Sequence, residues 1–312
     1  MRRTVTRPTM VNPRLIRLSA LVGLGLLLLV ASGCSRVSLG YNTADFFIER
    51  YADDYLSLNG DQMAAWEPRL ENALARHRRD ELPYLAAFFD AGYKGTQRGF
   101  DKATVDCLMD QLEEIYRRNA RVAAGLAAPL LAGLSQRQIR KLARKFQKDE
   151  AGDARGDQES AAQRARKRAK RYAESTEWWI GPLTKGQSRI IQEVTAAMPD
   201  TAQAWKAYTQ AKRRTLIRLL EQRVGEVAIR RFLTEWLVNF RDLPPDLRQA
   251  HLGMRHSIGV LFVRLDASFS HEQRAHLIKR LRDLRDDFMS LQKRPRMAAT
   301  QCSGASTAAS RL

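Results

Sequence analysis

Two histidine pairs are the first residues in this sequence whose spacing invites a metal-site interpretation. His271 and His276 flank Glu272 in the string HEQRAH, and His251 and His256 have the same separation of five residues. A helical zinc protease site needs histidines four residues apart, because that spacing places both on one face with the glutamate between them. The sequence therefore predicts no metal site and no cofactor.

Other residue types capable of catalysis lack the spacing that catalysis needs. Asp53 and Asp54 are adjacent, so their carboxylates point in different directions on a helix and do not share a proton. His77 lies near Asp80 and Glu81 in ARHRRDELP, a cluster typical of surface ion pairs. The sequence contains no G-x-S-x-G elbow, Walker loop or Rossmann glycine run. We therefore expect a protein that binds rather than an enzyme.

Residues 1–33 have the three zones of a secretory signal. A basic segment without acidic residues runs to Arg17, an apolar run follows from Leu18 to Val30, and small residues lead to Gly33. The apolar run is shorter than the roughly 20 residues that a membrane-spanning helix needs. We expect this signal peptide to be removed on export.

Cys34 follows this segment directly, and LLLLVASGC resembles a bacterial lipoprotein signal, although Ala31 departs from the Leu usual at that position. The resemblance implies that Cys34 becomes a triacylated N-terminus, and two or more acyl chains anchor a protein stably. Ser35 implies the outer membrane of a Gram-negative cell, with the protein facing the periplasm. The alternative is ordinary cleavage with an unmodified Cys34. Whether Cys107 and Cys302 form a disulfide is left open.

A basic run at 164–171, RARKRAKR, is the strongest local charge feature. Its six positive residues are Arg164, Arg166, Lys167, Arg168, Lys170 and Arg171. The whole chain carries a formal net charge of +19, which favours anionic partners such as phosphate-bearing lipids, acidic polymers or acidic proteins. Nucleic acid is not expected, because the signal indicates export. The alternative is a solvated connecting helix balanced by nearby acidic residues.

Helices must position these residues. Apolar residues in 47–58, 229–240 and 277–291 recur with the spacing of one helical face, and no run alternates as a strand would. The sequence predicts an all-α fold, an elongated bundle of about 8–10 helices. The expected parts after the signal are a lipidated tether at 34–41, helical bundles at 42–146 and 172–294, a charged connecting helix or linker at 147–171 and a disordered tail at 295–312. The alternative is one core shared by both halves.

Four short strings share an apolar residue, a hydroxyl or amide residue and a glutamine: LNGDQ, LSQRQ, LTKGQ and FSHEQ. Each predicts a capping box, in which the glutamine accepts a hydrogen bond from the backbone N–H of the cap residue. The predicted pairs are Asn59 with Gln62, Ser135 with Gln138, Thr184 with Gln187 and Ser270 with Gln273. Because glutamate serves a capping box equally, caps alone do not explain why all four strings use glutamine.

LTKGQ and LSQRQ resemble the LTxxQ signature of the Spy/CpxP group of all-helical periplasmic proteins, although this chain is longer than a typical member. Members bind unfolded or membrane-stress-associated proteins without ATP, so the resemblance implies that the cap residues belong to a binding motif. Bare helix capping is the alternative. The Cys-led signal, YNTADFFIERYADDYLSL, HRRDELP and EWWIGPLTKGQ together resemble an uncharacterised family of bacterial all-helical lipoproteins.

Aromatic residues gather around the third string: Tyr172, Trp178, Trp179, Trp205 and Tyr208. Together with arginines they could form an adhesive surface, and burial in the core is the alternative. We expect a lipid-anchored periplasmic binding protein, either an ATP-independent chaperone or an envelope-stress sensor. The alternative is a structural adaptor that links the outer membrane to an acidic envelope polymer or partner protein. The expected partners are the membrane, through the lipid, and unfolded or acidic envelope proteins.

Overall fold

The structure is a computed structural model that describes residues 36–154 and 159–299. The chain divides into two units, residues 1–43 and 44–312. The helix described in the first unit is α2 (Arg36–Asn42). The described residues are almost entirely helical and contain no strand, which confirms the all-α prediction. None of the helices in this described part is long and apolar enough to cross a membrane.

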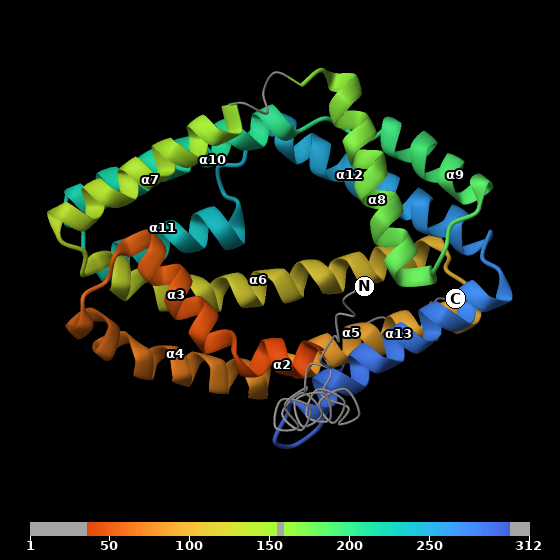
Figure 1. Ribbon diagram of the computed structural model, residues 1–312, viewed down its shortest axis with the longest axis horizontal. Helices are drawn as coiled ribbons and strands as arrows, with labels where there is room; N and C mark the ends of the chain where they lie inside the picture. Colours follow the sequence, from red (N-terminus) through yellow and green to blue (C-terminus); the bar gives the residue numbers. More distant parts are fainter. Residues whose placement is uncertain (1–35, 155–158, 300–312) are drawn as a thin grey trace, which may run out of the picture. The chain divides into compact units, whose positions relative to one another are not determined.

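The described part of the second unit consists of helices, most of them joined by short turns (Figure 1). They are α3 (Ala44–Leu56), α4 (Gly60–Asp80), α5 (Leu82–Arg98), α6 (Lys102–Ala132), α7 (Gln136–Ala154), α8 (Ala161–Ile180), α9 (Lys185–Ala196), α10 (Ala202–Glu221), α11 (Glu226–Thr234), the π-helix η2 (Glu235–Asn239), α12 (Pro245–Asp266) and α13 (His271–Ser290). The predicted connecting segment 147–171 is divided between the end of α7 and the start of α8. Residues 155–158, between them, lie outside the described part, as does most of the predicted tail.

Local sequence accounts for several helix boundaries. Asp101 caps α6, because its carboxylate accepts a hydrogen bond from the backbone N–H of Thr104 at 2.8 Å. Gly99 after α5 and Gly181 after α8 have φ of 89° and 85°, in the left-handed region that glycine tolerates best. Ser57 after α3 also has a positive φ, 51°, which is uncommon for a residue with a side chain.

The segment 229–240 differs from the single regular helix that its apolar spacing predicts. The α-helix ends at Thr234, η2 follows, and Phe240 adopts a left-handed conformation with φ 48° and ψ 39°. The wider π-turn still buries Val238, so the apolar pattern continues through it and conceals the change of helix type. The ring of Phe240 lies beside Tyr116 and Trp205.

The two halves of the second unit pack reciprocally. Helix α5 lies along α13, and α7 lies along α10, while α6 contacts α12 (Figure 1). The buried clusters mix the halves: Leu70 and Ile139 share one with Leu220, and Val105 shares another with Leu281. The expected segments 42–146 and 172–294 therefore share their cores.

Two glycines of α5 allow close packing, one against α13 and one against the segment that follows α5. A Cβ added at Gly92 would lie 3.3 Å from Cδ2 of Leu281, and one added at Gly95 would lie 2.6 Å from Cε1 of Phe100. The second distance is shorter than any normal carbon contact, and Phe100 is itself buried. The sequence therefore needs glycine at position 95 for tertiary packing, at the expense of helix propensity.

We expect Gly95→Ala to lower the free energy of unfolding by about 1–3 kcal/mol, because the ring of Phe100 must shift. The matched control is Gly259→Ala in α12, where no atom lies within 4 Å of the added Cβ. The control should gain up to about 1 kcal/mol from better helix propensity. Chemical denaturation followed by circular dichroism measures both, and equal gains in the two variants would contradict this packing argument.

Candidate functional site

The glutamines of the first two strings meet across the fold. The side-chain amide of Gln138 donates to Oε1 of Gln62 at 2.7 Å, and the amide of Gln62 donates to Oε1 of Gln138 at 3.3 Å. Gln62 also donates to the backbone oxygen of Gly133 at 3.0 Å, and Gln138 to that of Ser57 at 2.8 Å. Each Oε1 accepts the backbone N–H of its own cap residue as well. Both amides therefore use all their donors and acceptors.

The other two strings repeat this arrangement. The amide of Gln187 donates to Oε1 of Gln273 at 2.7 Å, and the reverse hydrogen bond is 3.0 Å. Gln187 also donates to the backbone oxygen of Ser268 at 3.1 Å, and Gln273 to that of Pro182 at 2.8 Å. Each again accepts the N–H of its own cap residue. Gln187 is fully buried, with an exposed fraction of 0%.

Reciprocal pairing explains why the strings use glutamine. A glutamate would keep the bond to the cap residue but could not donate to its partner or to the backbone carbonyl. All four capping boxes are present, from Asn59, Ser135, Thr184 and Ser270. In the structure the string residues thus cap helices and join their starts to one another. A role for these residues in binding stays a prediction. The feature of the sequence that could have revealed this pairing is the similar separation of the two partners, 76 residues in one pair and 86 in the other.

Each glutamine pair closes one of two equivalent modules. The first contains α3, α4, α5, α6 and α7, and the second contains α8, α9, α10, α12 and α13. In the first module α3 packs on α4 and α7, and in the second α8 packs on α9 and α13. The contacts of α5 with α13 and of α10 with α7 are likewise equivalent, as in an isologous interface between two identical subunits. Helix α11 and η2 have no counterpart in the first module.

The basic run lies in the first half of α8, and the structure uses much of its charge internally. Arg164 pairs with Asp200, and Arg168 donates to the backbone oxygens of Thr195, Met198 and Pro199 at and beyond the end of α9. Lys167 pairs with Glu159 and Lys170 with Glu174. Arg166 and Arg171 are exposed and form no ion pair with a described residue. The predicted patch thus keeps two unpaired charges.

Four aromatic residues form a partly exposed cluster between α6, α10 and the end of η2. Tyr116 stacks on Phe240 with ring centroids 6.0 Å apart, and Phe240 meets the edge of Trp205 at 6.3 Å. Trp205 contacts Tyr208 at 5.6 Å. Tyr116 is 46% exposed and Trp205 is 38% exposed. We call these four residues the aromatic cluster.

A buried lysine in an ion pair and a strained backbone conformation lie at the aromatic cluster. Buried Lys212 pairs with Asp242, and this hydrogen bond lowers the pKa of Asp242 below its ordinary value. Burial, together with the charge of Asp242, raises the pKa of Tyr208 to about 12, and the Tyr208 hydroxyl has no partner among the described residues. The left-handed Phe240 follows the π-turn. Such strained backbone and π-turns are concentrated at functional sites.

The remaining aromatic residues of the prediction are divided between surface and core. Trp178 is 49% exposed, and the guanidinium of Arg280 lies 4.2 Å from its ring centroid. Trp179 and Tyr172 are half-buried beside separate core clusters. Of the residues in the aromatic cluster, Trp205 and Tyr208 belong to the predicted set. Tyr116 and Phe240 were missed, because they come from other parts of the chain.

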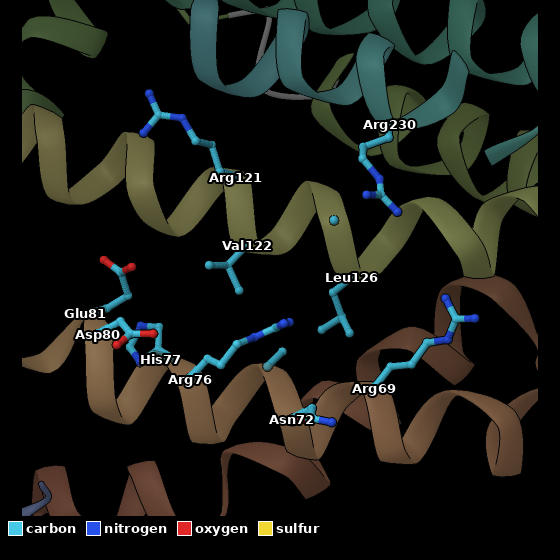
Figure 2. A pocket seen from close by; sticks show the side chains of 12 residues that line it. Arg69, Asn72, Arg76, His77, Asp80, Glu81, Arg121, Val122, Leu126 and Arg230 are labelled. Atoms are coloured by element: carbon cyan, nitrogen blue, oxygen red, sulfur yellow. The ribbon is translucent and has the colours of Figure 1, made fainter. Parts of the chain in front are cut away.

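A groove of about 500 Å³ lies between α4 and α6, with Arg230 of α11 above it (Figure 2). Its apolar lining residues, which we call its floor, are Ala73, Val122, Gly125 and Leu126. Its other lining residues are Arg69, Asn72, Arg76, His77, Asp80, Glu81, Arg121 and Arg230. In Figure 2, Val122 and Leu126 point from α6 toward α4, and Arg76 extends along the space between the helices. We call this the arginine groove.

Hydrogen bonds hold both ends of the arginine groove. At one end Trp66 donates from its indole nitrogen to the backbone oxygen of Leu126 at 3.1 Å. At the other, His77 and Asn119 are hydrogen-bonded at 2.6 Å, and Arg118 donates twice to Glu81 at 2.6 and 3.0 Å. The separation of α4 and α6 is therefore fixed without a ligand, which lowers the entropic cost of binding one.

Two sequence predictions concern residues outside the arginine groove and the aromatic cluster, namely the histidines and the cysteines. His271 and His276 lie in α13, and the described residues hold no group of three or more His, Cys, Asp or Glu side chains that could bind a metal. Cys34 and Cys302 lie outside the described residues. Cys107 on α6 takes part in a disulfide bond.

Comparison with known proteins identifies one family. A family model described as a family of unknown function, DUF6279, matches residues 54–246, which is more than half of the chain. No curated protein and no solved structure matches. The matched region contains the first three strings and ends before the fourth.

We expect Gln187→Glu to lower the free energy of unfolding by about 3 kcal/mol or more, because Ser268 and Gln273 lose their donor inside the protein. Gln163→Glu is the matched control. Gln163 completes the capping box of Ser160 at the start of α8, is exposed and pairs with no other glutamine. The control should change stability by less than about 0.5 kcal/mol. Urea denaturation distinguishes the two, and similar small effects would show that pairing adds nothing to capping.

Proposed function

The chain belongs to DUF6279, a family of unknown function, and we propose that it is a lipid-anchored periplasmic binding protein. Its proposed role is that of an ATP-independent chaperone or envelope-stress sensor similar to Spy/CpxP. It acts by holding unfolded or acidic envelope proteins, without catalysis. Its anchor is the lipid on Cys34, in the outer membrane and facing the periplasm.

The observation that carries this proposal is the aromatic cluster. Exposed aromatic side chains offer large contact areas at a low entropic cost, and they dominate the binding energy of many protein surfaces. Tyr116 is held in place by its hydroxyl, which donates to the backbone oxygen of Leu237 at 3.0 Å. Trp205 packs against both Tyr208 and Phe240. The cluster is thus a fixed apolar surface for an exposed client segment.

The alternative is a structural adaptor between the outer membrane and an acidic envelope polymer or partner protein. Arg166 and Arg171 favour it, since both are exposed and neither is ion-paired within the described chain. An adaptor of this kind binds by charge, so salt weakens it. Holding an unfolded client on aromatic side chains depends much less on salt.

Trp205→Gln should weaken client holding about tenfold, because an aromatic hot spot contributes about 1–2 kcal/mol. The measurement is light scattering of a chemically unfolded client with the protein present, at low and high salt, using one acidic and one basic client. We expect the unchanged protein to suppress aggregation of both clients at both salt concentrations. Trp178→Gln is the matched control, since Trp178 is similarly exposed and lies outside the aromatic cluster.

Three results would contradict the holding role in different ways. Suppression of the acidic client alone, and only at low salt, would favour the adaptor. An equal loss in the Trp178→Gln and Trp205→Gln variants would remove the aromatic cluster from the proposal. No suppression in any condition would overturn the chaperone role itself.

We expect mass spectrometry of the protein from the envelope to find Cys34 as the N-terminus, carrying diacylglycerol and an acyl chain. Cys34→Ser should release the protein from the membrane fraction, because stable anchoring needs these chains. With Cys34 lipidated, the disulfide of Cys107 must join it to Cys302, and a non-reducing digest tests this. An N-terminus at another residue, or a Cys34–Cys107 disulfide, would contradict the lipid anchor.

A further inference from the structure

We propose that the arginine groove is a binding site for an acidic peptide segment in which carboxylates flank one apolar side chain. The groove lies on α4, α6 and α11, and shares no residue with the aromatic cluster. The inference therefore goes beyond the proposed holding of clients and can fail or succeed independently of it.

The first argument is the glycine in the floor of the groove. Gly125 lies deep within α6, a helix that continues to Ala132, and glycine there is less favourable than alanine by about 1 kcal/mol. Glycines of this kind usually make room for a neighbouring helix, as Gly92 does for Leu281 of α13. Nothing lies within 4 Å of a Cβ added at Gly125. No described group of the protein occupies the space that this glycine leaves, so it is open to an external group.

The second argument is the charge around that space. Arg69 and Arg76 line the groove from α4, are exposed, and form no ion pair with a described residue. Arg230 on the other side pairs with Glu226 of its own helix. A carboxylate that entered the groove would thus meet guanidinium groups from two helices.

The acidic residues that line the groove do not neutralise Arg69 and Arg76, because they pair with other arginines. Asp80 pairs with Arg79, and this hydrogen bond lowers the pKa of Asp80 below its ordinary value. Glu81 accepts hydrogen bonds from Nε and Nη2 of Arg118. Both carboxylates lie at one end of the groove and already have cationic partners, so the side chains of Arg69 and Arg76 remain available to a ligand.

The third argument concerns size and selects a peptide. From Val122 to Leu126 the apolar floor is about 6 Å long, at 1.5 Å per helical residue. That length holds one aliphatic or aromatic side chain and is too short for a lipid acyl chain. Arg69 and Arg76 are two helical turns apart, about 10.5 Å along α4. In an extended peptide the two residues that flank one apolar residue are about 6.8 Å apart. The long side chains of glutamate and arginine cover the remaining distance, so both carboxylates can reach an arginine.

The test uses the full chain in a neutral detergent and a labelled peptide with a central Leu flanked on each side by Glu. Binding is followed by fluorescence anisotropy at low salt. Peptides with Ser in place of Leu, or Gln in place of Glu, should bind at least about tenfold more weakly. Inorganic phosphate and vesicles with anionic phospholipid serve as competitors, and neither should displace the peptide at equal concentration.

Variants of the protein locate the site. Gly125→Trp should fill the floor and abolish binding, while Ala123→Trp, on an exposed position of the same helix, should not change it. The double variant Arg69→Gln/Arg76→Gln should weaken binding at least about tenfold. Its control, Arg166→Gln/Arg171→Gln, removes the same charge from exposed, unpaired arginines elsewhere and should leave binding within about twofold. Gly125→Ala should raise the melting temperature, because the added methyl group has free space.

Each other outcome overturns the inference. Equal weakening by the two double arginine variants would mean general attraction to a basic protein. Undiminished binding by Gly125→Trp, with an unchanged melting temperature, would place the peptide elsewhere. Binding of phosphate or vesicles in preference to the peptide would assign the groove to another ligand. No binding of the peptide by the unchanged protein, together with intact client holding, would overturn this inference and leave the proposed function standing.

Discussion

The fold depends on a primary amide meeting a second primary amide. A glutamine side chain has two hydrogens to donate and one oxygen that accepts twice, and each of the four paired glutamines uses all of these. One interaction thereby caps two helices, joins them and satisfies the carbonyl that precedes each start. Because Gln187 is fully buried, any unmade bond there would leave a polar group without water. The geometry of each module follows from this requirement.

The two modules have equivalent helix packing, and their surfaces differ. The reciprocal contacts of α5 with α13 and of α7 with α10 are those of a symmetric dimer within one chain. The addition of α11 and η2 to the second module breaks that symmetry. Helix α11 packs on α6 and brings Arg230 to the arginine groove, and η2 brings Phe240 to the aromatic cluster. Both candidate binding surfaces thus depend on the segment that has no counterpart in the first module.

The sequence predicted the local features of the fold well. The helical class followed from apolar spacing, and the capping boxes followed from residues three positions apart, such as Thr184 and Gln187. The glutamine pairs were not predicted, since partners lie 76 and 86 residues apart and meet through tertiary packing. The π-turn escaped prediction because Val238 stays buried through it. The arginine groove escaped because each of its arginines, taken alone, resembles an ordinary exposed charge on a helix.

The reciprocal packing also governs when the chain can fold. Helix α5 buries Gly92 against Leu281, so its partner is synthesised nearly two hundred residues later. Contacts this distant in sequence require a large loop to close before they stabilise anything, and they slow folding. The first module cannot cover its apolar face on α5 until α13 has been made. A chain with this topology keeps apolar surface of its first module uncovered until α13 is available to pack on α5.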